Sequence, residues 1–234
     1  MPWLTGTAYW PFKDFSTPLR PENPIPYVNQ KGVVERDLTP KESYYVFQSY
    51  WSDRPMIHIY GHSWATRWGK NGERKTIKVY SNCSEVELFL NGKSLGIKKR
   101  NSQDFPAAGL RWEVKFAPGK NNLHAIVRDQ GVTLDDEVQF YYETRSWGEP
   151  TNLILSTESE SDKSIWVTAT LKDKNGVTCL DAKNFISFEI AGDCILHANL
   201  GTSTGSKKVQ AYNGRARIKV TKTGPQAVIA VKSD

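Results

Sequence analysis

The sequence predicts a mainly β chain in which two immunoglobulin-like β-sandwiches follow each other, preceded by a strand, a long loop and a helix. Apolar and polar residues alternate with a period of two over many short segments after residue 56, which is typical of half-buried strands. Turn signals such as Asn91-Gly92 and Asn213-Gly214 separate these segments, as expected for hairpins. The first fifty residues differ, because they combine many aromatic residues, several prolines and one helical pattern.

The N-terminal part begins with a strand and a loop. Residues 7–10 form a short apolar run before Pro11, which predicts the last part of a buried strand. Four prolines between residues 16 and 26 exclude a helix interior and a central strand, so this segment is predicted to be a rigid, extended loop. Gly32 would supply a positive φ if the backbone turns there.

A helix follows the loop. Thr39 and Glu42 have the spacing of a capping box, and Pro40 stands at the first helical position. Tyr44 and Trp51 then lie on one helical face. A single strand–loop–helix unit cannot bury its own apolar face, so we expect it to pack against further elements of the same kind. No segment after residue 55 has the pattern of such elements.

The alternating segments divide the rest of the chain into two domains. The predicted strands of the first sandwich lie at 57–60, 76–80, 85–90, 93–96, 110–116, 122–128 and 137–142, a spacing typical of an immunoglobulin-like fold. Those of the second lie at 164–171, 185–190, 194–200, 207–212, 215–220 and 227–231. The predicted domains are therefore residues 1–55, which are incomplete, 56–146 and 147–234.

Composition excludes several classes of partner. The net charge is +6, but Lys and Arg are scattered rather than gathered in a stripe, so no nucleic-acid partner is expected. No apolar run approaches the roughly 20 residues that span a bilayer. The three cysteines are too few for a disulfide scaffold, and buried free thiols are the preferred interpretation. The cellular compartment and the oligomeric state stay open.

No residue of the chain can be assigned as catalytic, and neither a metal nor a cofactor is expected. His58 and His62 lie on a predicted strand and turn rather than a helix, so the pair is not expected to present both rings on one face. Glu42 is explained by the helix cap. The other acidic residues of the N-terminal part lie on loops or at a strand end and are not assigned as acid or nucleophile: Asp14, Glu22, Glu35 and Asp37.

Several motifs resemble family 2 glycoside hydrolases of gut bacteria, a family that includes β-galactosidases and β-glucuronidases. Residues 10–15, 20–24, 29–32, 36–37 and 40–41 look like the eighth strand, loop and final helix of their TIM barrel. Residues 61–64 and 80–93 resemble the β-domain that follows this barrel. The resemblance implies two tandem immunoglobulin-like β-sandwiches preceded by a remnant of a TIM barrel.

The resemblance also implies roles for three residues. Trp10 matches the tryptophan that forms a wall of the sugar pocket, and an indole offers a large rigid surface for a sugar. Asn29 and Lys31 match the motif with which β-glucuronidases bind the substrate carboxylate, and an ammonium beside an amide suits an anion. Because the resemblance extends to β-galactosidases, galactoside and glucuronide specificity both stay open.

The family's acid/base and nucleophile glutamates lie on earlier barrel strands. The resemblance therefore implies a C-terminal fragment of a retaining exo-β-glycosidase, which binds its carbohydrate substrate through the parent barrel and is inactive alone. The parent would be compatible with a periplasmic or secreted location. The alternative is a non-catalytic carbohydrate-binding or spacer module of two β-sandwiches, of which the spacer is preferred because the alternation assigns many aromatic residues to cores.

Overall fold

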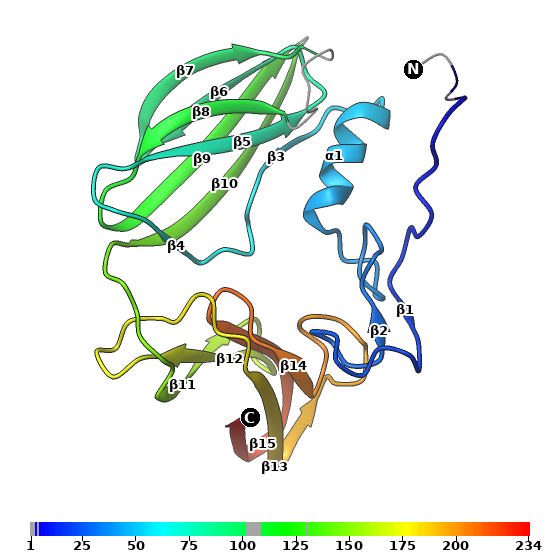
Figure 1. Ribbon diagram of the computed structural model, residues 1–234, viewed down its shortest axis with the longest axis vertical. Helices are drawn as coiled ribbons and strands as arrows, with labels where there is room; N and C mark the ends of the chain where they lie inside the picture. Colours follow the sequence, from blue (N-terminus) through cyan, green and yellow to red (C-terminus); the bar gives the residue numbers. More distant parts are fainter. Residues whose placement is uncertain (1–2, 4, 102–108, 130) are drawn as a thin grey trace. The chain divides into compact units, whose positions relative to one another are not determined.

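The computed structural model describes residues 3, 5–101, 109–129 and 131–234, and it is mainly β as predicted (Figure 1). The described chain divides into two compact units, one formed by residues 1–41 together with 147–234 and the other by residues 42–146. The helix therefore groups with the first sandwich and the preceding loop with the second. The predicted boundaries at residues 55 and 146 stay predictions. No helix among the described residues is long and apolar enough to cross a membrane.

The unit of residues 42–146 is a sandwich of two sheets beside one helix. Its elements are α1 (Glu42–Trp51), β3 (Ile57–Ile59), β4 (Thr66–Trp68), β5 (Arg74–Ser81), β6 (Glu85–Leu90), β7 (Lys93–Lys99), β8 (Leu110–Lys115), β9 (Gly119–Asp129) and β10 (Val132–Glu143). One sheet has the order β4-β10-β9-β6-β7 and the other β3-β5-β8. Every pairing is antiparallel except β4 with β10.

The core of this unit forms from the alternation that the sequence shows. Val86 and Leu88 on β6 and Val79 on β5 are completely buried in one apolar cluster, while their neighbours in the sequence are more exposed. The hairpin from β6 to β7 turns at Asn91 and Gly92, both with positive φ, as a type I′ turn requires.

The unit of residues 1–41 and 147–234 holds the second sandwich. Its elements are β1 (Phe15–Ser16), β2 (Val28–Asn29), β11 (Asn152–Ser159), β12 (Ser164–Lys172), β13 (Phe185–Leu196), β14 (Lys208–Gln210) and β15 (Arg215–Ser233). β1 pairs with β2, and the others form one sheet in the order β11-β12-β15-β13-β14. Ile25 and Val28 of the N-terminal loop belong to the same buried cluster as the sandwich residues. The loop is thus part of this core.

Two long strands replace four of the predicted strands. β13 and β15 each continue through a segment that the sequence analysis treats as a break. The pairing between them shifts at a β-bulge between Gly192 and Cys194. Gly192 has a φ of +80°, and a Cβ at this position would collide with the carbonyl oxygen of Gln226. The bulge bends the strand pair without ending it, which period-two alternation alone does not reveal.

The predicted strand at residues 7–10 and the predicted capping box are both wrong. Residues 5–11 form no strand, and the first strand is the short pair of β1 with β2. A strand needs an edge to pair with, and no described strand offers one to residues 5–11. The capping box is also absent, because Thr39 N donates to Asp37 Oδ1 (3.0 Å) while the Glu42 carboxylate accepts from Gly61 N (2.9 Å). Pro40 still bridges to Val34 as extended chain, so the helix begins only at Glu42.

Candidate functional site

The 29–32 turn carries two of the three residues that the resemblance assigns to the substrate. Asn29 ends β2, and its Oδ1 accepts a hydrogen bond from Lys31 N (3.2 Å). The hydroxyl of Tyr9 donates to the Lys31 carbonyl (2.6 Å) and ties the N-terminal segment to the turn. The side chain of Asn29 thus shapes the turn through its oxygen, and its amide nitrogen takes no part in the turn.

A buried ion pair, Asp14 with Lys41, stabilises the backbone of the turn. The Asp14 side chain is 0% exposed, and its Oδ1 accepts from Lys41 Nζ (2.7 Å) and from Gly32 N (2.9 Å). Lys41 Nζ also donates to the carbonyl of Gln30 (3.0 Å). One carboxylate and one ammonium therefore fix the backbone on both sides of Lys31. Charge-assisted hydrogen bonds are the stronger kind, so this backbone is rigidly held.

Gly32 is required for a reason other than the expected one. It does not have a positive φ, so the expectation of a left-handed residue at this position is wrong. A Cβ on Gly32 would instead collide with the backbone of Lys13 and Asp14. The glycine allows the turn to approach the Asp14 segment closely enough for the hydrogen bond to form.

The charged end of Lys31 has no partner among the described residues. Within the described part of the chain, neither the Lys31 ammonium nor the Asn29 amide nitrogen makes a hydrogen bond or an ion pair. Lys31 is exposed and Asn29 is half-buried. A positive group and a neutral donor on one fixed turn can together bind a carboxylate.

Trp10 is connected to this turn through β1. Its side chain is 79% exposed and packs edge-to-face on Phe15, with ring centroids 5.9 Å apart. Phe15 is the partner of Asn29 in the register of β1 and β2. The indole therefore rests on the strand next to the turn, and its exposed surface is available for stacking.

The acidic residues of the N-terminal part have structural partners. Asp14 pairs with Lys41, Asp37 accepts from Thr39 N, and Glu22 lies 3.9 Å from Arg20. Both oxygens of Glu35 accept from Ser203, at 2.6 and 2.9 Å. The described residues here offer no pair of acids suited to glycoside hydrolysis, which uses two carboxyl groups on either side of the bond.

A groove of about 770 Å³ lies in the same unit. It runs between the N-terminal loop and the second sandwich, and its lining includes Tyr27, Arg36, Glu189, Lys207 and Lys208. The groove could not be predicted from the sequence, since its walls come from segments more than 150 residues apart and no motif connects them.

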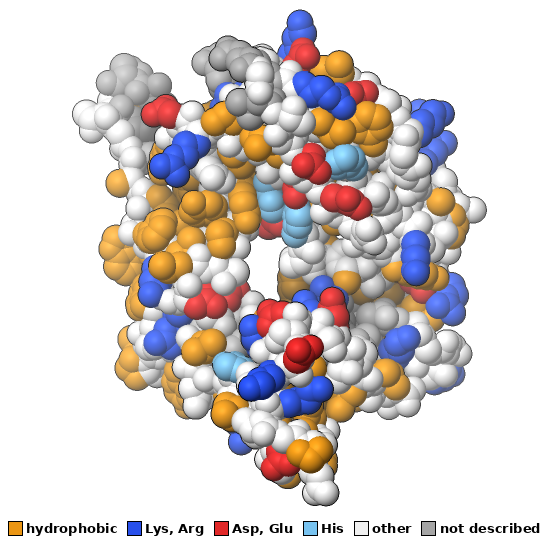
Figure 2. Space-filling model, turned by 180° about the vertical axis from the view of Figure 1, so that it is seen from behind, with side chains coloured by type: hydrophobic (Ala, Val, Ile, Leu, Met, Phe, Trp, Pro, Cys, Tyr) orange, Lys and Arg blue, Asp and Glu red, His pale blue; other side chains and the backbone are white. Residues whose placement is uncertain are grey.

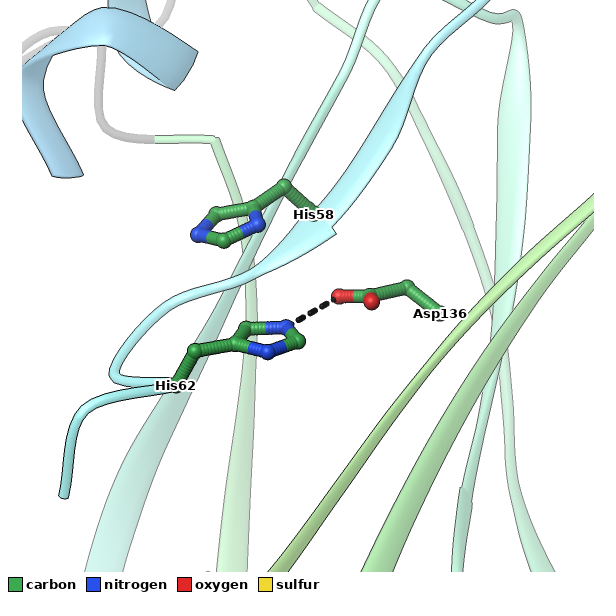
Figure 3. A group of neighbouring side chains, drawn as sticks. All are labelled: His58, His62 and Asp136. Atoms are coloured by element: carbon green, nitrogen blue, oxygen red, sulfur yellow. Dashed lines mark hydrogen bonds and ion pairs between the residues drawn. The ribbon is translucent and has the colours of Figure 1, made fainter. Parts of the chain in front are cut away.

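A second group of chemically competent side chains lies in the other unit (Figures 2 and 3). Figure 2 shows histidine side chains next to acidic ones on the surface. We call His58, His62 and Asp136 the histidine cluster, because each offers a ligand atom within 4.8 Å of the others (Figure 3). The expectation that the pair would not present both rings on one face is wrong: the rings are stacked, with centroids 4.6 Å apart and planes 15° apart.

The backbone explains why the two rings meet. Gly61 has a φ of +93°, so the chain turns directly after β3 and brings His62 back beside His58. Asp136 Oδ2 accepts from His62 Nε2 (2.8 Å) and from Ile59 N (2.6 Å). Burial alone would raise the pKa of Asp136, but these hydrogen bonds and the nearby histidines outweigh it and hold the pKa below its usual value.

Comparison with known proteins finds relatives for most of the chain. Residues 72–135 match a family model described as a domain of unknown function, DUF4982. The chain is 46% identical over 222 residues to a candidate β-glucuronidase of Formosa agariphila, covering 94% of this chain and 27% of that protein. It is 30% identical over 167 residues to the β-galactosidase BoGH2A of Bacteroides ovatus, covering 69% of this chain and 18% of that protein.

A solved structure agrees with these relatives. The crystal structure of the β-glucuronidase of Parabacteroides merdae superposes with a TM-score of 0.93 at 59% identity, covering 100% of this chain and 30% of that one. The chain thus spans less than a third of the length of each of these three proteins. The resemblance found in the motifs is confirmed, and the chain corresponds to a C-terminal part of a family 2 glycoside hydrolase of the β-glucuronidase and β-galactosidase type.

Proposed function

We propose that this chain forms one edge of the sugar-binding site of a retaining exo-β-glycosidase that releases terminal glucuronic acid. Lys31 and Asn29 bind the carboxylate of the glucuronide, and Trp10 stacks on the apolar face of the sugar ring. The two glutamates that perform hydrolysis belong to barrel strands outside this chain. The two sandwiches support this edge as spacers.

The observation that carries the proposal is the fixed 29–32 turn with a free ammonium. The Asp14–Lys41 pair and the Tyr9 hydroxyl hold the backbone on both sides of Lys31, yet the charged end of Lys31 has no partner in the described residues. A group that is held ready before the ligand arrives loses less entropy on binding. Such an arrangement favours a ligand with a negative charge.

The chemistry of the turn favours a glucuronide over a galactoside. The two sugars differ at C6, where a glucuronide has a carboxylate and a galactoside a neutral hydroxymethyl group. A hydrogen bond to an ionised partner contributes about 1.5–3 kcal/mol, and one between neutral groups contributes about half as much. The names of the Formosa agariphila and Parabacteroides merdae relatives support the same choice.

The test replaces Lys31 in the enzyme that carries this chain together with its barrel. For Lys31→Ala we expect kcat/KM on nitrophenyl β-glucuronide to fall by about 10- to 150-fold, the loss of one charge-assisted contact. Turnover of nitrophenyl β-galactoside, where measurable, should change far less. Lys93→Ala, at the start of β7 in the unit of residues 42–146, serves as the control and should leave both rates unchanged. Equal losses on the two substrates would contradict the carboxylate-binding role.

The isolated chain provides a second measurement. Because the described acidic residues near the turn are bound to structural partners, we expect no hydrolysis of either nitrophenyl glycoside by the chain alone. Turnover by the isolated chain that persists through purification and is lost on substitution of one of its own carboxylates would contradict the proposal.

The groove favours a second candidate function, in which this unit binds glycan without cleaving it. Arg36 and Lys207 line the groove, and within the described residues neither guanidinium nor ammonium group has a hydrogen-bond or ion-pair partner. A calorimetric screen of the chain against neutral and uronate-containing glycans decides this case. Binding of an acidic glycan that Lys207→Ala weakens would support it, and the absence of binding leaves the spacer role.

A further inference from the structure

We propose that the histidine cluster is a binding site for one divalent transition-metal ion of the Zn²⁺ type. His58 on β3, His62 on the following turn and Asp136 on β10 bring two imidazoles and one carboxylate together (Figure 3). This donor set favours zinc and its neighbours over Ca²⁺ or Mg²⁺, which prefer oxygen ligands.

The hydrogen bonding of His58 prepares one ligand atom. His58 Nε2 lies 3.1 Å from Glu42 Oε2, and Glu42 Oε1 accepts from Gly61 N (2.9 Å), so the carboxylate is held in place. A carboxylate only accepts, hence the neutral ring carries its proton on Nε2 and presents a bare lone pair at Nδ1. A carboxylate bound to the far nitrogen of a histidine is the usual support for a metal ligand.

The other two ligands are already in contact with each other. His62 Nε2 donates to Asp136 Oδ2 (2.8 Å). A metal ion takes the place of the proton between these atoms, and the neutral His62 ring then carries its proton on Nδ1. Ile59 N holds Asp136 Oδ2 at 2.6 Å, so the carboxylate stays oriented when the proton moves.

The electrostatics of the cluster suit a cation. Glu42 and Asp136 have no ion pair with a lysine or arginine in the described part of the chain, and the nearby Arg67 donates to the carbonyls of Tyr60 and Gly61 instead. Two carboxylates therefore lie beside the two imidazoles.

Binding requires one side chain to move. The two imidazole planes are nearly parallel, so their lone pairs do not converge on one point, whereas a metal ion lies in the plane of each ring about 2.0–2.1 Å from its nitrogen. His58 is fixed, because it is buried and Tyr45 stacks on it with centroids 3.5 Å apart. The His62 side chain is 39% exposed on a turn, so its ring is the one that rotates.

The test measures binding of Zn²⁺ to the purified chain by calorimetry after treatment with a chelator. We expect one equivalent to bind and the melting temperature to rise, with reversal by EDTA. His62→Ala and Asp136→Asn should each weaken binding at least tenfold. His124→Ala is the matched control, because His124 forms a similar pair with Asp135 (3.0 Å) but has no second histidine in its group, and it should bind as the unaltered chain does.

Cobalt distinguishes this site from the cysteines. The chain has three free thiols, Cys83, Cys179 and Cys194, which could also bind the ion. Co²⁺ at the histidine cluster gives visible d–d bands without a thiolate charge-transfer band, and His62→Ala abolishes them. A thiolate band, the lack of stoichiometric binding, or equal weakening in His124→Ala would overturn the proposal. Circular dichroism of each variant verifies that a lost signal does not come from unfolding.

Discussion

The carboxylates of the 29–32 turn and of the histidine cluster have different roles. In the turn, Asp14 is completely buried and bound to an ammonium, and it holds backbone so that another residue, Lys31, can face a ligand. In the cluster, Asp136 is partly exposed and contacts His62, the residue with which it would bind the metal ion. The first carboxylate is part of the scaffold and the second is part of the site itself. The comparison therefore predicts a large effect on stability for the first region and a small one for the second.

The largest effect is expected for Asp14→Ala. Removing this carboxylate leaves the Lys41 ammonium, only 24% exposed, without its partner, and breaking a buried ion pair costs about 3–5 kcal/mol. Urea denaturation of the chain measures the free energy of unfolding. Lys41→Met added to Asp14→Ala should recover part of the loss, because no charge is then left unpaired. A loss below about 1 kcal/mol would contradict the scaffold role of Asp14.

Gly32→Ala tests the close approach behind the turn. The new methyl group would collide with the backbone of Lys13 and Asp14, so the turn must shift and the hydrogen bond from Gly32 N must lengthen. We expect a loss of about 1–3 kcal/mol in the free energy of unfolding, as for other overpacked sites. In the enzyme with its barrel, the shift of Lys31 should also raise KM for the glucuronide.

Gly6→Ala is the matched control for this substitution. A Cβ at Gly6 meets no atom within 4 Å, and the residue does not have a positive φ. It should leave both the stability and KM unchanged. An effect equal to that of Gly32→Ala would show that the N-terminal segment is sensitive to any added methyl group. The close approach of Gly32 to Lys13 and Asp14 would then not be the cause of the loss.

The same contrast shows how much of the molecule could be predicted from its sequence. Alternation and the Asn91-Gly92 turn predict the sandwich strands, because burial on one face leaves a period of two. The bulge at Gly192 escapes prediction, since it depends on the approach of Gln226 from a distant segment. The continuous strands β13 and β15 are therefore each predicted as two separate strands.

The candidate sites divide in the same way. The residues of the turn could be named from a local motif, but its support by Asp14 and Lys41 joins positions 27 residues apart and could not. The histidine cluster was misjudged because its geometry depends on the positive φ of Gly61 and on Asp136, which lies 74 residues after His62. The spacing of His58 and His62 in the sequence indicates neither the turn at Gly61 nor the proximity of Asp136.

The smallest effect is expected for Glu42→Gln, which is the test of the second region. Glu42 is the counterpart of Asp14, because its carboxylate holds both a backbone nitrogen, Gly61 N, and a side chain, His58. It is 30% exposed, and glutamine keeps an oxygen for Gly61 N while neutral His58 can change its tautomer. In EDTA we expect a loss of about 1 kcal/mol or less in the free energy of unfolding, measured in urea. A loss as large as that of Asp14→Ala would mean that the carboxylates of the cluster are also scaffold, and the distinction between the two regions would fail.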